Sequence, residues 1–117
     1  MTRQVPEYIQ RFLRERKELA IVISDHAIRS RPGQKAVTTQ QIFKVVQEGE
    51  VDVDACQEFE DKLYDKIATY RYFAEESRTI KAIVTVNWEA WLCQVETIWT
   101  YPGRQHRGRS DQERREH

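Results

Sequence analysis

Residues 79–87, "TIKAIVTVN", decide the fold of this chain. Ile80, Ala82, Val84 and Val86 alternate there with more polar neighbours. Alternation with a period of two residues is typical of a β-strand that buries one face in a core. The stretch therefore predicts a strand, and its pairing partners are expected in the segments on either side of it.

Two further segments of strand-forming composition flank this stretch. They are "KIATYRYF" at 66–73 and "LCQVETIWTY" at 92–101, and the short polar stretches between them suit turns. Pro102 and Gly103 end the last strand. We therefore expect an antiparallel meander of three to four strands over this part of the chain.

The first half of the chain predicts helices. "PEYIQRFLRERKEL" at 6–19 has apolar residues at helical spacing, and Thr38 with Gln41 forms a capping box before a helix over 39–48 that Gly49 ends. "AIVIS" at 20–24 fits either a buried strand or a continued helix. The expected fold class is α+β, with the N-terminal helices packed on one face of the sheet.

Length and composition indicate one domain over residues 1–103, followed by a polar tail over 104–117 that we expect to be mobile. The net charge is zero, but residues 1–44 carry nine basic and four acidic side chains, whereas residues 45–65 carry one basic and eight acidic. A polyanion would meet a locally positive surface despite the zero total.

The cysteines and the N-terminal residues indicate whether to expect a metal site or an association with a membrane. Cys56 and Cys93 are far apart in sequence and have no histidine at ligand spacing, so we expect neither a metal site nor a cofactor. The start of the chain lacks an apolar signal segment, and the longest purely apolar run is Ala20–Ile23. These features favour a cytoplasmic protein with no membrane partner.

Several motifs, in this order, resemble domain-of-unknown-function family 4258, a set of small bacterial domains grouped with the BrnT and RelE toxins. They are "ISDHAIRSR", "TTQQIFKVVQEGEV", "YRYF", "IKAIVTVN" and "ETIWTY", which together extend from about residue 21 to residue 101. The resemblance implies a sheet packed by helices and kinship with metal-independent ribonucleases. It also implies RNA as a partner, or a small antitoxin protein.

Metal-independent RNA cleavage needs a base, an acid and positive charge on the phosphate. Histidine as a residue type suits either proton role. A helix over 25–31 would place Arg29 one turn from His26, where its guanidinium could bind a phosphate. Tyr101 at the end of the last strand completes the predicted catalytic set with His26 and Arg29. Arg31, Arg71 and Thr100 are the predicted substrate-binding residues.

Each of these residues also has a purely structural interpretation. His26 sits where a helix begins, Asp25 and Arg29 suit a surface ion pair, and Arg71 suits a solvent-facing strand position. Tyr101 alternates in phase with Val95 and Trp99, which favours a core or edge aromatic.

The aromatic residues also have both a functional and a structural interpretation. Tyr64, Tyr70, Tyr72, Trp88 and Trp91 suit either base stacking or the core.

Two functions therefore follow from the sequence. The first is a toxin-like endoribonuclease that acts on RNA without a metal. The second is a non-catalytic module of the same fold that binds a small protein partner. The balanced charge and the acidic segment at 48–65 favour the second.

Overall fold

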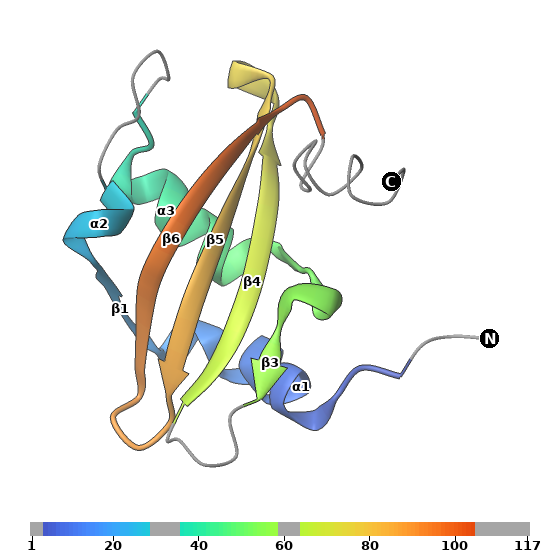
Figure 1. The fold of residues 1–117 in the computed structure, drawn as a ribbon, viewed down its shortest axis with the longest axis vertical. Helices are drawn as coiled ribbons and strands as arrows, with labels where there is room; N and C mark the ends of the chain where they lie inside the picture. The colour runs from blue at the N-terminus through green and yellow to red at the C-terminus, as the bar shows by residue number, and fades with distance from the viewer. Residues whose placement is uncertain (1–3, 29–35, 59–63, 105–117) are drawn as a thin grey trace, which may run out of the picture.

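A computed structural model describes residues 4–28, 36–58 and 64–104. The predicted meander is present: β4 (Tyr64–Phe73), β5 (Arg78–Asn87) and β6 (Leu92–Pro102) are long neighbouring antiparallel strands (Figure 1). Both neighbours pair with β5 along its whole length, from Arg78 to Asn87. The alternating stretch that predicted a strand therefore lies in the interior of the sheet.

The sheet is larger than predicted and is not purely antiparallel. Among the described residues it has six strands, in the order β1-β6-β5-β4-β2, with β3 also paired to β4. The additional strands are β1 (Ala20–Ile23), β2 (Glu50–Val51) and β3 (Gln57–Glu58). Strand β1 runs parallel to β6, with Ala20 opposite Leu92. The α+β class is confirmed, whereas the prediction of three to four antiparallel strands was wrong in number and direction.

Two helices lie on one face of this sheet, α1 (Glu7–Glu15) and α3 (Thr39–Glu48). The capping box of α3 is present, because the Thr38 hydroxyl accepts from the Gln41 amide at 3.1 Å and the Gln41 side chain accepts from the Thr38 amide at 3.0 Å. Short 3-10 turns η1 (Arg16–Glu18), η2 (Val53–Ala55) and η3 (Ala74–Glu76) link the elements.

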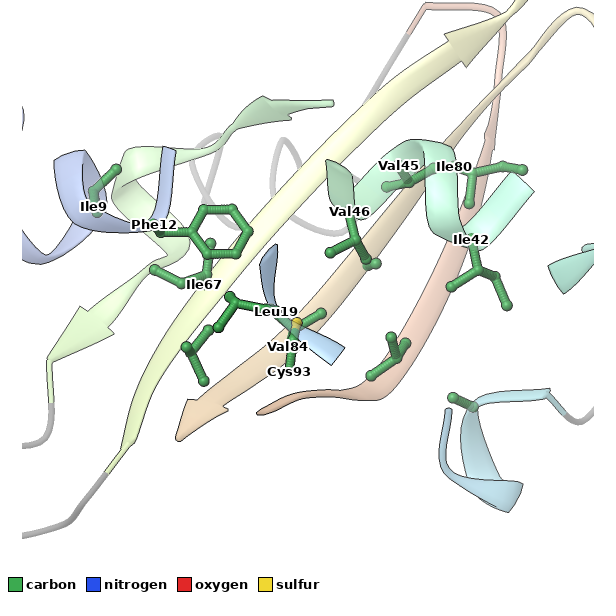
Figure 2. Close-up of a cluster of buried hydrophobic side chains, with 14 of the residues drawn as sticks. Ile9, Phe12, Leu19, Ile42, Val45, Val46, Ile67, Ile80, Val84 and Cys93 are labelled. Atoms are coloured by element: carbon green, nitrogen blue, oxygen red, sulfur yellow. The ribbon is translucent and has the colours of Figure 1, made fainter. Parts of the chain in front are cut away.

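The core forms between these helices and the inner face of the sheet (Figure 2). The largest fully buried side chains come from both layers: Ile9 and Phe12 of α1, Ile42, Val45 and Val46 of α3, and Ile67, Phe73, Ile80, Val84, Val86 and Val95 of the strands. Burial of this apolar surface is the main favourable contribution to folding.

One irregularity in β6 changes which of its side chains enter the core. Ile83 pairs with Thr97 but Val84 pairs with Val95, so Glu96 is an extra residue, a β-bulge. Cys93 and Val95 before the bulge are fully buried, whereas after it Ile98 packs against the core. Trp99 and Tyr101 therefore lie on the opposite face, and the expectation that Tyr101 is in phase with Val95 was wrong.

A buried ion pair lies on that opposite, outer face of the sheet. The ammonium of Lys81 in β5 donates to a carboxylate oxygen of Asp52 at 2.8 Å, and the two side chains are only 9 % and 6 % exposed. The amide of Asp52 donates to the carbonyl of Ala68 in β4 at 2.8 Å. The pair thus fixes the segment after β2 to the two central strands.

Removal of one partner would leave a buried charge without its counterion. We expect Asp52→Asn to lower the free energy of unfolding by about 3 kcal/mol, because the Lys81 ammonium remains in a buried position. Adding Lys81→Met to this variant should recover part of the loss, since no charge is then buried. Urea denaturation of the two variants and the wild type would test this, and a loss below about 1 kcal/mol in Asp52→Asn would contradict it.

Candidate functional site

A cavity lies at the edge of β4, just past the end of β2. Strand β2 covers β4 only where Glu50 pairs with Tyr70 and Val51 with Thr69, within the described residues. Beyond that point β4 continues to Phe73. The cavity has a volume of about 390 Å³ and is lined by Glu48, Gly49, Glu50, Tyr70, Arg71, Tyr72, Thr79 and Arg104.

Gly49 brings the end of α3 against this edge. A Cβ atom at Gly49 would overlap the carbonyl oxygen of Val45 and would lie 2.7 Å from that of Tyr70. Glycine is required here for its lack of a side chain, because its φ of −72° is open to any residue. The sequence predicted that Gly49 ends the helix, and the structure shows that it also permits contact with β4.

Arg16 holds the same helix end from outside the cavity. Its guanidinium donates to the carbonyl of Gly49 at 2.7 Å and to that of Val46 at 3.5 Å. A cation at the C-terminus of a helix satisfies free carbonyl groups. Burial lowers the pKa of Arg16, and the negative charge of Glu48 partly opposes this shift. Glu48 and Glu50, on either side of Gly49, are thereby placed at the cavity.

A second glycine, directly after β6, brings Arg104 to the cavity. Gly103 has a φ of +64°, which favours glycine, and its amide donates to the Ser77 carbonyl at 2.8 Å. The Thr79 hydroxyl donates to the Gly103 carbonyl at 2.7 Å. The turn places the Arg104 guanidinium 4.1 Å from the ring centre of Tyr72. Arg104 was assigned to the tail, but it packs on the sheet.

Two arginines and two glutamates line the cavity, and the two guanidiniums reach this strand edge from opposite faces of the sheet, because Arg71 alternates with Tyr72 along β4. The Arg71 guanidinium lies 4.9 Å from the ring centre of Phe73, and Arg104 lies over Tyr72. Within the described part of the chain, neither guanidinium forms an ion pair or a hydrogen bond. Both are therefore available for a ligand, and guanidinium groups suit the two-point binding of phosphate.

The predicted site residues are divided between two regions. Arg71 lines the cavity, and Tyr101 pairs with Thr79, which also lines it. Thr100 pairs with Ile80 on the inner face. His26 does not line this cavity.

His26 is exposed in α2 (Asp25–Ile28), which follows β1. The amide of Ser24 donates to Val95 of β6 at 3.1 Å, and Tyr101 is six residues further along that strand, or about 20 Å. The Ser24 hydroxyl accepts from the Ala27 amide at 3.2 Å and so caps this short helix. Arg29 and Arg31 lie outside the described residues.

Several residues of the cavity were not predicted as site residues. The sequence places Glu48 and Glu50 in the acidic segment, Arg104 in the tail and Thr79 in a strand. The signal that could have found the glutamates is "EGE" directly after a capped helix, where a glycine lets two carboxylates approach a neighbouring strand. No sequence pattern shows that a turn at Gly103 returns Arg104 to the same place.

No family model, curated protein or solved structure matches the chain in comparisons with known proteins. In the described ranges, no three His, Cys, Asp or Glu side chains converge as metal ligands. The helices of those ranges are too short or too polar to cross a bilayer. The cavity is therefore interpreted from its own chemistry.

We expect Gly49→Ala to be strongly destabilising, because the new methyl group would overlap two backbone carbonyls that cannot easily move. A loss of about 3 kcal/mol in the free energy of unfolding is the scale of severe overpacking. Gly103→Ala is the matched control, since a methyl group there meets nothing within 4 Å and only the positive φ opposes it. The free energy of unfolding of Gly103→Ala should fall by about 1 kcal/mol. Urea denaturation would measure both variants. Equal losses of stability in Gly49→Ala and Gly103→Ala would contradict the inference that close contact with the two carbonyls requires glycine at position 49.

Proposed function

We propose that this chain is a metal-independent endoribonuclease and that the cavity at the edge of β4 is its active site. The observation that carries the proposal is that one cavity is lined by two glutamates and by two arginines that form no ion pair among the described residues. Positive charge on the phosphate and a group that accepts a proton are two requirements of RNA cleavage. The resemblance to toxin-like ribonucleases points to the same substrate.

The reaction assigns a role to each kind of group. A carboxylate of Glu48 or Glu50 takes the proton of the ribose 2′-hydroxyl, whose oxygen then bonds to the adjacent phosphorus. The bond from phosphorus to the 5′-oxygen breaks, and that oxygen leaves with a proton from water. Arg71 and Arg104 stabilise the charge that develops on the phosphate oxygens. The products are a 2′,3′-cyclic phosphate and a 5′-hydroxyl.

This assignment moves the acid–base role away from His26. The sequence made His26 the catalytic candidate, but Ser24 caps its helix, and the cavity lies beside the far ends of β4 and β6. Arg71 keeps the phosphate-binding role that the sequence predicted. The substrate would be cytoplasmic RNA.

A non-catalytic module that binds a small protein is the second candidate. Glu48, Glu50, Asp54 and Glu58 are exposed along the side of β4 that carries β2 and β3. A row of carboxylates beside a strand edge would suit a basic segment of a partner such as an antitoxin. This candidate predicts a basic ligand, whereas the first predicts an acidic one.

Cleavage of a mixed RNA pool in EDTA would test the proposal. We expect the wild type to cut RNA and Arg71→Gln to lose about a hundredfold or more in kcat/KM, the scale for removal of one group that stabilises a transition state. Glu48→Gln and Glu50→Gln would identify the base. His26→Ala and Arg14→Gln, an exposed arginine of α1, are the matched controls and should retain activity.

Two results would overturn this assignment. No cleavage by the folded wild type would leave the protein-binding module as the better candidate. Loss of cleavage in His26→Ala, with Arg71→Gln fully active, would return the active site to α2. Circular dichroism of each variant would show that the loss is not one of folding.

A further inference from the structure

The two edges of the sheet differ in how they are protected from pairing with another chain. At one edge, β4 is covered by the two-residue strands β2 and β3, and the exposed residues Glu50, Asp54 and Glu58 lie along it. Short strands and charged side chains are common means by which proteins prevent a strand edge from pairing. At the other edge, β1 has the sequence "AIVI", without a charge, proline or glycine, and no bulge interrupts its pairing with β6.

Strand β1 lies at the end of the sheet and pairs on one side only. Its neighbour is β6, and no described helix or strand lies beside it on the other side (Figure 1). The amide of Ala20 donates to the carbonyl of Trp91 at 3.0 Å, so alternation directs the amide and carbonyl groups of Ile21 and Ile23 away from β6. Within the described ranges, these four backbone groups form no hydrogen bond.

The side chains of β1 are apolar on both faces of the sheet. Val22 lies on the outer face and is 46 % exposed. Ile21 and Ile23 are half-buried on the inner face, where they pack against the margin of the core. Exposed β-branched side chains beside free backbone groups are the features of a strand edge that pairs with a further strand.

We propose that β1 is a dimerisation edge, at which two copies of this chain pair their β1 strands in antiparallel orientation around a two-fold axis. When Ile21 of one copy lies opposite Ile23 of the other, all four free backbone groups of each copy form hydrogen bonds. No other antiparallel register satisfies these groups within the strand. Val22 then lies on the axis and faces Val22 of the other copy, so each covers the other's exposed side chain.

The charges that flank β1 favour a second copy as the partner. Lys17 and Glu18 in η1 precede the strand, Asp25 and His26 in α2 follow it, and all four are exposed. Antiparallel pairing brings the start of each β1 to the end of the other, so Lys17 approaches Asp25 and Glu18 approaches His26 across the interface. The net charge of the chain is zero, so two copies do not repel each other as a whole.

The dimer would join the two sheets into one continuous sheet. The cavity lies at the opposite edge, beside β4, so pairing through β1 leaves the cavity of each copy open. Dimerisation is therefore independent of the proposed catalytic function, and either can fail without the other.

Sedimentation equilibrium of the full chain would test the proposal at concentrations from about 1 to about 200 μM, the range of affinities typical of small interfaces. We expect the apparent mass to rise reversibly from that of one chain to that of two. A wild type that stays monomeric over this range would overturn the proposal. A monomer that instead pairs at β1 with a strand of another protein would also overturn it.

Variants at the axis test the register. Val22→Lys and Val22→Glu should each raise the dissociation constant about a hundredfold or more, because two like charges then meet on the axis. An equimolar mixture of the two variants should associate again, since opposite charges face each other. Phe43→Lys is the matched control: Phe43 is 38 % exposed on α3, away from β1, and this variant should dimerise like the wild type.

Two results with these variants would contradict the proposal. Unchanged dimerisation of Val22→Lys would place the interface elsewhere. A mixture that stays monomeric, with both variants folded by circular dichroism, would exclude Val22 from the axis.

Amide hydrogen exchange of the wild type, followed by NMR, tests the same contact without a variant. The amides of Ile21 and Ile23 should exchange more slowly as the concentration rises, because they become hydrogen-bonded. The amides of Ala20 and Ser24 already donate to β6 and should change much less. A dimeric sample in which Ile21 and Ile23 still exchange rapidly would overturn the proposal.

Discussion

The extra residue at Glu96 in β6 decides which side chains of this strand lie on each face of the sheet. Before it, the strand contributes Cys93 and Val95 to the core, and after it Ile98 takes over that role. The same change of phase sends Trp99 and Tyr101 to the outer face. Without the bulge, two large aromatic side chains would compete for space on the inner face, and the outer face would lose its β6 rings. A single inserted residue therefore makes a packed core compatible with an aromatic surface.

The sequence predicted a helix or strand correctly wherever a pattern extended over many residues. The alternation at 79–87 and the capping box at Thr38 each predicted an element that the structure confirms. It was insufficient for strands of two residues, such as β2 and β3, which are too short to show a period. The parallel pairing of β1 and the bulge were also missed, because both depend on tertiary contacts.

Only part of the candidate site was predicted, because only part of it lies in elements with a long sequence pattern. Arg71 lies in a long strand whose position follows from its pattern. Glu48, Glu50 and Arg104 reach the cavity only because Gly49 permits close contact with Tyr70 and Gly103 reverses the chain. The distance between α2 and the far end of β6 follows from where β1 pairs along that strand, which no local pattern specifies.

The parallel pairing of β1 with β6 has a consequence for the order of folding. β1 is the first of the described strands to leave the ribosome, and its partner β6 is the last. Loop closure between them spans most of the domain, which is typical of a slow late step. Until β6 emerges, the apolar segment Ala20–Ile23 has no strand to pair with, and the nascent chain exposes it to chaperones and to other chains.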